Sequence, residues 1–310
     1  MKEFFKVKTI EDVLEYRTQF ARMQTEEVPI TDSIGRILAE DIHSDIDLPD
    51  FARSTMDGFA VRGASTFGAS EGNPAYLAVK GTVAMGESSH LSVGPGEAVR
   101  ISTGGMLPAG TDSVVMVEHT GVIDDTTIEV YRSVAPGQNM VAVGEDIKRG
   151  EAILTAGRNI RPQEAGVLAA LGRPAVAVYK KPVVGIISTG DEIVPVSEVP
   201  GPGQIRDVNT YTLMGQVLEL GAVAVPFGLV GDDYDALLAK SARALEQCDL
   251  VLVSGGSSVG VRDFTIDIIA AMKSSAILFH GISISPSAFT MVLINPDLPR
   301  IGSAQLTPSF

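Results

Sequence analysis

The stretch Pro182-Val-Val-Gly-Ile-Ile-Ser188 decides the fold of the second half of the chain. It is a short, continuous apolar run, which is typical of a strand that is buried on both faces of a parallel sheet. Helical and strand-like patterns alternate after it, in the order Thr210–Leu220, Ala222–Val230, Tyr234–Gln247 and Asp249–Ser254. This alternation predicts a parallel α/β domain over residues 180–286.

The sequence before this domain has a different texture. Residues 45–147 contain short apolar or alternating runs separated by Gly, Pro, Asn and Asp, namely Tyr76–Val79, Ala98–Ile101, Ser113–Val117 and Thr127–Tyr131. Such a pattern predicts a small, inserted all-β domain. Thr9 can cap a first helix in the segment 1–44, and residues 148–179 form a connecting segment with a helical pattern at Gln163–Leu171. The predicted fold class is therefore a multidomain α/β and β protein.

Composition restricts the class of protein. The 310 residues are 45% hydrophobic and carry a formal net charge of -14, with a single cysteine, Cys248. A globular, acidic chain without a Lys/Arg cluster is not expected to bind nucleic acid or a membrane. No Cys/His spacing predicts a zinc site, and Cys248 is expected to be a buried structural thiol. With no signal peptide and no apolar run long enough to span a bilayer, we expect a soluble, cytoplasmic protein.

Each predicted strand of the α/β domain runs into a polar loop. The three loops are Ser188-Thr-Gly-Asp-Glu192, Gly231-Asp-Asp233 and the stretch from Ser254 to Asp263. Parallel topology brings such loops to one edge of the sheet, where ligands bind. The carboxylates of Glu192, Asp232 and Asp263 favour Mg²⁺, which prefers oxygen ligands and often bridges protein to phosphate. Asp263, and either Asp232 or Asp233, could instead cap the helices that follow.

The third loop, Ser254-Gly-Gly-Ser-Ser-Val-Gly260, can cradle a phosphate because its glycines let backbone N–H groups approach an anion. It is not a Walker A loop, since no Gly-Lys-Ser/Thr follows. A plain strand-to-helix turn explains this loop about as well.

The stretch Asp47-Leu-Pro-Asp-Phe-Ala-Arg-Ser-Thr-Met-Asp-Gly-Phe-Ala60 concentrates polar groups in a loop rather than in a core strand. It places Asp57 directly before a glycine, an arrangement suited to presenting a carboxylate to a ligand. Thr103, in the loop Arg100–Pro108, could offer a hydroxyl to a ligand or stabilise a turn. Glu118 could face a cleft or simply face solvent at a strand end.

Taken together, these motifs resemble the molybdopterin molybdenumtransferase family, which includes the gephyrin E domain. The resemblance covers about residues 1–286 and follows the family's order, through the motifs Asp47–Ala60, Arg100–Pro108, Val114–Glu118, Ser188–Glu192, Gln204–Asn209, Gly231–Asp233, Ser254–Gly260 and Asp263. It implies an enzyme that inserts molybdenum from molybdate into adenylylated molybdopterin, with Mg²⁺ assistance and release of AMP. It also implies an elongated homodimer in which the β domain of one subunit and the α/β domain of the other share the cleft. The adenylylating enzyme of the pathway is a further candidate partner.

The resemblance also implies roles for individual residues. The catalytic set is Asp57, Thr103, Glu192, Asp232 and Asp263, of which Glu192, Asp232 and Asp263 would bind the metal. The residues expected to bind substrate are Ser188, Thr189, Gly190, Asp191, Gly255, Gly256, Ser257, Ser258 and Gly260. In the implied mechanism the metal neutralises charge on the phosphoanhydride, molybdate or water attacks phosphorus, and Asp57 positions or activates the nucleophile.

The sequence departs from the family pattern after Pro286. The family continues with a Gly-Lys-Pro element, a Leu-Pro-Gly-Asn/His-Pro loop and a C-terminal β domain, whereas this chain has Ser287-Ala-Phe-Thr-Met-Val-Leu-Ile-Asn-Pro296 and ends at Phe310. We therefore expect a divergent tail at 287–310, an incomplete α/β domain and no C-terminal β domain. The alternatives are a non-catalytic molybdopterin-binding module, a Mg²⁺-dependent pyrophosphatase that acts on other nucleotides, and an inactive, truncated family member.

Overall fold

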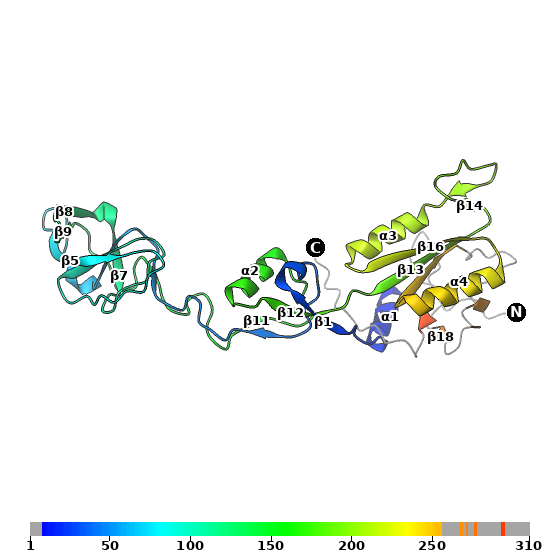
Figure 1. The fold of residues 1–310 in the computed structure, drawn as a ribbon, viewed down its shortest axis with the longest axis horizontal. Coiled ribbons are helices and arrows are strands. Elements are labelled where there is room, and N and C mark those ends of the chain that lie inside the picture. The colour runs from blue at the N-terminus through cyan, green and yellow to red at the C-terminus, as the bar shows by residue number, and fades with distance from the viewer. Residues whose placement is uncertain (1–7, 256–266, 269–270, 272–275, 278–292, 295–310) are drawn as a thin grey trace. The chain divides into compact units, whose positions relative to one another are not determined.

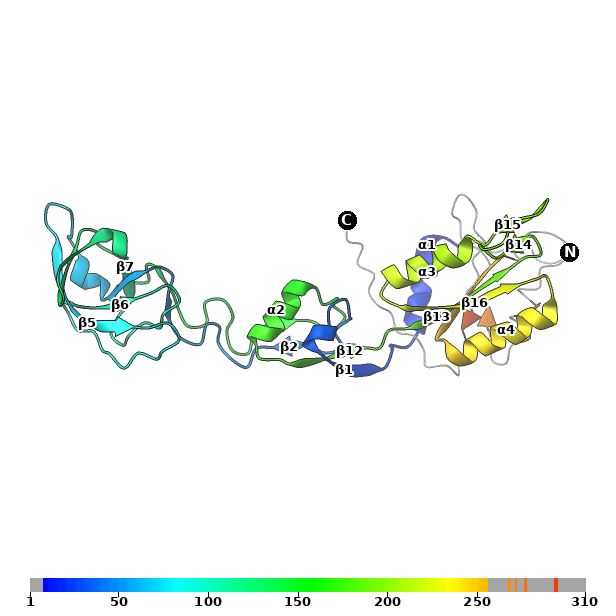
Figure 2. The same cartoon turned by 45° about the horizontal axis from the view of Figure 1, so that its top comes forward.

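The computed structural model describes residues 8–255, 267–268, 271, 276–277 and 293–294. The chain forms two compact units: residues 41–154 make one, and residues 1–40 with 155–310 make the other. Figures 1 and 2 show the elements of both units from two directions. In the part of the chain that the structure describes, no helix has the length and hydrophobicity needed to cross a membrane.

The unit 41–154 is built on a mixed six-stranded sheet. Its strand order is β7-β4-β6-β5-β9-β8, and only β5 and β6 are parallel neighbours. The strands span Gly58–Val61 (β4), Ala75–Val83 (β5), Glu97–Ile101 (β6), Ser113–Met116 (β7), Thr120–Asp124 (β8) and Thr127–Val130 (β9). β5, β6, β7 and β9 overlap the apolar runs in the sequence, and β4 overlaps the end of the Asp47–Ala60 stretch, so the prediction of β structure is confirmed for these strands. The strand β8 is not among the predicted runs.

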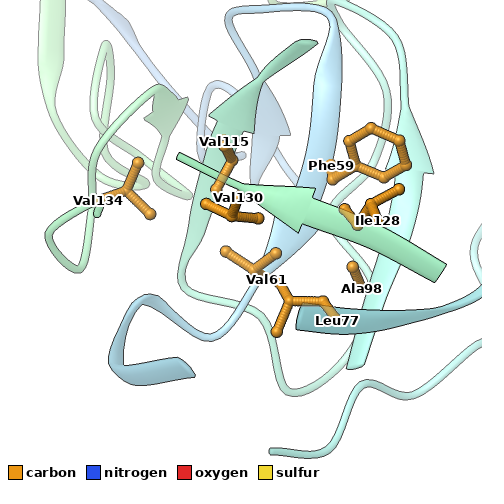
Figure 3. Close-up of a cluster of buried hydrophobic side chains, with 8 residues drawn as sticks. All are labelled: Phe59, Val61, Leu77, Ala98, Val115, Ile128, Val130 and Val134. Carbon is orange, nitrogen blue, oxygen red and sulfur yellow. The ribbon is translucent and has the colours of Figure 1, made fainter. Parts of the chain in front are cut away.

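Figure 3 shows the largest buried cluster of this unit, to which β4, β5, β6, β7 and β9 all contribute. Its buried side chains point toward one another and are Phe59, Val61, Leu77, Ala98, Val115, Ile128, Val130 and Val134. Burying each of the larger side chains contributes about 1.5–3 kcal/mol to folding. The cluster thus fixes the positions of β4 and β6, whose ends carry the candidate site.

Shorter elements complete this unit. Two antiparallel pairs join its ends, β2 (Ile42–His43) with β11 (Ala152–Leu154) and β3 (Arg53–Ser54) with β10 (Met140–Val141). The 3-10 helices η3 (Gly63–Thr66) and η4 (Val117–His119) follow β4 and β7.

The other unit begins with α1 (Ile10–Glu15), which Thr9 caps together with Asp12, as the sequence predicts. After η1 (Tyr16–Gln19), β1 (Thr25–Pro29) pairs antiparallel with β12 (Ala175–Tyr179). The connecting portion also holds η2 (Ile30–Asp32) and α2 (Pro162–Ala170), which confirms the predicted helix to within one residue. Glu164 of α2 is buried and pairs with Arg158 and Arg161.

The α/β portion contains a three-stranded parallel sheet of order β16-β13-β17. Its elements are β13 (Val183–Thr189), α3 (Asn209–Glu219), β16 (Val223–Val230), α4 (Tyr234–Gln247) and β17 (Leu250–Ser254), which confirms the predicted order. The short strands β14 (Ile193–Val194) and β15 (Ile205–Arg206) pair between β13 and α3, and β18 (Ala276–Ile277) pairs with β19 (Leu293–Ile294).

The central strand β13 explains why helices cover both faces of this sheet. Val184 and Ile186 pack with Val217 of α3, whereas Ile187 packs with Leu237 and other residues of α4. Successive side chains of a strand point to opposite faces, so an uninterrupted apolar strand needs a cover on each side. Cys248 is buried beside Gly185, as expected for a structural thiol, and burial raises the pKa of its thiol.

Candidate functional site

Asp57 and Thr103 meet at one end of the β sheet. Asp57 directly precedes β4 and Thr103 follows β6, and the antiparallel register pairs Gly58 with Ile101. The Asp57 carboxylate accepts a hydrogen bond from the Thr103 backbone N–H at 2.7 Å and another from the Thr103 hydroxyl at 3.0 Å. The structure therefore brings together the two residues of this unit that belong to the predicted catalytic set.

Two features of the local sequence hold this loop in place. A Cβ on Gly58 would lie 1.9 Å from the carbonyl oxygen of Val115, so only glycine fits between Asp57 and the sheet. Ser54 is buried, and its hydroxyl donates to the Met56 carbonyl at 2.5 Å. The Ser54 backbone also binds the Thr103 loop, because its carbonyl accepts from the Gly104 N–H at 2.7 Å and its N–H donates to the Gly105 carbonyl at 3.0 Å.

The electrostatics of the pair keep Asp57 ionised. The backbone N–H of Thr103, followed by its hydroxyl, lowers the pKa of Asp57. Both side chains are exposed. A carboxylate with a lowered pKa is a weak general base but a good hydrogen-bond acceptor, so this geometry suits orienting a ligand better than removing a proton.

Glu118 follows a residue whose backbone contacts Asp57. It is exposed in η4, and the backbone N–H of the preceding residue, Val117, donates to the Asp57 carbonyl at 3.0 Å. Its backbone is therefore tied to the Asp57 loop.

The second candidate place is the carboxyl edge of the parallel sheet. Ser188 of β13 pairs with Leu229 of β16 and with Ser254 of β17, so the three strands end side by side. The polar loops that follow these strands consequently start from one edge.

The first two acidic loops contact each other at this edge. Asp191 accepts a hydrogen bond from the Asp232 backbone N–H at 2.9 Å, and a Cβ on Gly231 would lie 2.8 Å from Asp191 Oδ1. The Glu192 carboxylate covers Gly190, whose φ is +146°. The cap of α4 is Asp233, which accepts from the Ala236 N–H at 2.8 Å, so Asp232 is not the helix cap.

Two residues expected to bind substrate are buried. The Ser188 hydroxyl donates to Asp207 Oδ1 at 3.2 Å, and Thr189 is equally inaccessible. A Cβ on Gly255 would lie 1.9 Å from the Thr189 carbonyl oxygen, and Gly255 has a φ of +104°. Ser188 and Thr189 thus lie beneath the surface and position the loops, whereas Asp191 and Gly255 are exposed to a ligand.

Two polar residues of this edge are absent from the set chosen from the sequence. Asp207 is buried and also accepts the Thr210 backbone N–H at 3.1 Å, and Asn209 Nδ2 donates to Ser254 Oγ at 2.6 Å. The motif Gln204–Asn209 contains both residues, and an Asp three positions before a helical residue is a capping signal. Their contacts with Ser188 and Ser254 have no signature in the sequence.

The metal set can be tested only in part. Asp263, Gly256, Ser257, Ser258 and Gly260 lie outside the described residues. Among the residues with described positions, no group of three or more His, Cys, Asp or Glu side chains could hold a metal ion. The described carboxylates of this edge are nevertheless oxygen donors of the type Mg²⁺ prefers, and Mg²⁺ often uses only one or two of them together with water and phosphate oxygens. They fit such an ion as part of its ligand set.

Comparisons with known proteins show the family of the chain. Residues 8–172 match the family model "MoeA N-terminal region (domain I and II)", and residues 185–303 match "Probable molybdopterin binding domain". The chain is 37% identical over 282 residues to a molybdopterin molybdenumtransferase of Bacillus subtilis, covering 90% of this chain and 65% of the relative. A Staphylococcus aureus protein of the same name is 36% identical over 265 residues, covering 86% of this chain and 63% of the relative.

A solved structure gives the same result for the fold. The molybdopterin biosynthesis MoeA protein from Pyrococcus horikoshii OT3 superposes with a TM-score of 0.79 at 34% identity, over 93% of this chain and 72% of that one. The mixed α/β fold with several sheets is thus shared with this structure. The chain spans less than two thirds of the length of the two curated relatives named above.

Proposed function

Because the chain belongs to the MoeA family of molybdopterin molybdenumtransferases, we propose that it inserts molybdenum from molybdate into adenylylated molybdopterin and releases AMP. The observation that carries this proposal is the contact between Asp191 and Asp232, which places two acidic strand-end loops side by side. Such an edge favours phosphoanhydride cleavage, because its carboxylates can hold a cation against phosphate oxygens.

The proposal gives each group of residues a role. Glu192, Asp232 and Asp263 would hold Mg²⁺, which when bound neutralises charge on the phosphoanhydride. Asp191, Gly190 and the loop from Gly255 to Gly260 would hold the phosphate-bearing part of the substrate. An oxygen of molybdate or water forms a bond to phosphorus, the bond between that phosphorus and the bridging oxygen breaks, and AMP leaves.

Asp57 acts on the nucleophile in this proposal. Its ionised carboxylate, fixed by Thr103, accepts a hydrogen bond from water, whether that water attacks phosphorus itself or hydrates the attacking molybdate, and so orients the nucleophile. Orientation of this kind can supply several kcal/mol of a barrier, since reacting atoms must lie in a near-attack geometry. Thr103 would act by holding Asp57 in place and keeping it charged.

We also propose that the chain acts as a homodimer, with the cleft shared between subunits. Tyr211 and Leu218 lie seven residues apart on α3, hence on one face, and are 57% and 59% exposed, and Leu220 beyond the helix is 75% exposed. A symmetric pair of such apolar faces would bury this surface in an isologous contact. Leu218→Lys should then shift the mass measured by light scattering from two chains to one, whereas Glu219→Lys should not.

The adenylylating enzyme of the pathway stays a predicted partner.

The test of the proposed function is AMP release from adenylylated molybdopterin, followed with and without molybdate and Mg²⁺. We expect release that requires both ions and is matched by the formation of molybdenum cofactor. Release that does not respond to molybdate would instead indicate a pyrophosphatase. Binding of molybdopterin without any release would indicate a binding module.

A further inference from the structure

The side chains of Asn209 and Ser254 connect α3 to the end of β17. Asn209 is the first residue of α3 and Ser254 is the last residue of β17, and Asn209 Nδ2 donates to Ser254 Oγ at 2.6 Å. Ser254 leads directly into the Gly/Ser loop. A side chain 45 residues away in sequence therefore fixes the hydroxyl with which this loop begins.

A second tie holds the start of α3 in place. Asp207, only 7% exposed, accepts one hydrogen bond from the Ser188 hydroxyl at 3.2 Å and one from the Thr210 backbone N–H at 3.1 Å. The first turn of α3 is consequently anchored to the ends of both β13 and β17. Asn209 cannot easily move away from Ser254 while Asp207 holds the helix.

The direction of the bond between Asn209 and Ser254 matters chemically. A hydroxyl has one proton to donate and two lone pairs to accept with, whereas the nitrogen of an amide only donates. Because Ser254 Oγ accepts from Asn209, the Ser254 proton is directed to another acceptor. Gly255 follows it and must be a glycine, because a Cβ there would lie 1.9 Å from the Thr189 carbonyl oxygen.

We propose that Ser254 donates a hydrogen bond to a phosphate oxygen of the substrate and that Asn209 is the positioning residue that keeps the Ser254 proton available for it. This inference rests on the proposed function and deepens it, because it names an uncharged phosphate donor in a chain of net charge -14. Hydrogen bonds to charged groups are stronger than neutral ones, so a fixed hydroxyl at this position favours a phosphate over a neutral ligand.

The decisive variant is Asn209→Asp, which reverses the bond without changing the size of the side chain. An aspartate at this position accepts the Ser254 proton and adds a negative charge, so both effects oppose phosphate binding. A carboxylate at the start of a helix is also stabilising, since it complements the helix dipole. We therefore expect the thermal midpoint to stay the same or rise while the affinity for inorganic pyrophosphate, measured by calorimetry with Mg²⁺, falls by more than about tenfold.

Thr212→Ala is the matched control. Thr212 is exposed in the same turn of α3, but its hydroxyl donates to the Val208 carbonyl at 3.2 Å, within its own helix. We expect this variant to bind pyrophosphate like the wild type. Equal losses in Thr212→Ala and Asn209→Asp would overturn the inference, because they would show an effect of helix integrity alone.

A double-mutant cycle tests whether Asn209 acts through Ser254. Asn209→Ala and Ser254→Ala should each weaken pyrophosphate binding about tenfold, and the double variant should lose little more than either single one. Independent, multiplying losses would contradict the positioning role, and so would wild-type affinity in Asn209→Ala.

The readouts also separate this inference from the proposed function. Pyrophosphate affinity does not depend on pterin or molybdenum chemistry. A chain that binds pyrophosphate through Asn209 and Ser254 but releases no AMP supports the inference and refutes the transferase activity. If the wild type releases AMP and Asn209→Asp releases it with an unchanged KM, the transferase activity is supported and the inference is refuted.

Discussion

The carboxylate of Asp57 accepts two hydrogen bonds from Thr103, a residue 46 positions later in the sequence, one from its backbone N–H and one from its hydroxyl. The antiparallel pairing of β4 with β6 brings the two residues together, and Gly58 lets the chain pass under Val115. The pairing of the strands, and not the loop alone, therefore places Asp57 beside Thr103. A variant that removes the contact can consequently change function without unfolding the loop.

Thr103→Val should raise the pKa of Asp57. The variant keeps the backbone hydrogen bond but loses the hydroxyl, which is the second cause of the lowered pKa. The folded protein holds Asp57 ionised to lower pH than an ordinary aspartate, so activity that needs the carboxylate is lost only as the pH falls through this lowered pKa. In Thr103→Val the acid limb of the pH–rate profile should move to higher pH.

The control for this shift is Ser102→Ala, which removes an exposed hydroxyl from the neighbouring position. NMR titration of the Asp57 carboxyl carbon would report the change directly. Identical titration curves for the wild type and Thr103→Val would contradict the role assigned to the Thr103 hydroxyl.

A mixed dimer should reveal a cleft shared between subunits. Asp57→Ala and Glu192→Ala should each abolish AMP release, because they remove groups from the two units of the chain. If Asp57 of one subunit serves the strand-end groups of the other, dimers that contain one chain of each variant regain one intact site. Re-associated equal mixtures should recover about a quarter of the wild-type rate, and no recovery would place both groups of a site in one subunit.

Gly58→Ala should destabilise the unit 41–154. A Cβ there would lie 1.9 Å from the Val115 carbonyl oxygen and 2.9 Å from its carbon, so the central strands must move apart. We expect a loss of about 2–4 kcal/mol in the free energy of unfolding, measured with urea. Gly72→Ala, where a Cβ meets nothing within 4 Å, should change it little, and equal effects of the two variants would be inconsistent with this packing.

The ion pairs of Glu164 should make the folding stability of the connecting portion decrease in acid. Its buried carboxylate pairs with Arg161 and Arg158, and these contacts, led by Arg161, lower its pKa to about 2. A lowered folded-state pKa gives stability that is fully present above the unfolded value of about 4.3 and is lost as the pH falls through the folded value.

Glu164→Gln should therefore lower the thermal midpoint by several degrees at pH 7 and flatten its dependence between pH 5 and pH 2. The exposed Glu71 provides the control, since Glu71→Gln should leave both quantities unchanged. A wild-type acid profile in Glu164→Gln would refute the assignment.

Periodicity and loop chemistry predict much of this fold. The α/β order follows from the continuous apolar run of β13, which must be covered on both faces, and from the amphipathic patterns of α3 and α4. The β unit follows from short runs between turn residues. The sequence cannot supply the pairing of β5 with β6 or the register of β4 with β6, because these depend on tertiary contacts.

Some residues of the candidate site can likewise be predicted from the sequence, whereas others are recognised only from tertiary contacts. Asp57 and Thr103 stand out as polar residues in Gly/Pro loops, and the structure joins them. Asp207 and Asn209 do not stand out, because their importance comes from contacts with Ser188 and Ser254 across the sheet edge. Ser188 begins a polar loop in the sequence but is buried, since it is the penultimate residue of β13, a strand that is covered on both faces.

The most direct test of the account is single-turnover AMP release from adenylylated molybdopterin in the presence of molybdate and Mg²⁺, with Asp57→Asn and Ser102→Ala alongside. We predict release by the wild type and by Ser102→Ala, and a loss of at least about a hundredfold in Asp57→Asn with an unchanged thermal midpoint. Equal rates in Asp57→Asn and the wild type would contradict the assignment of Asp57, and no release by a folded wild-type chain would contradict the transferase activity itself.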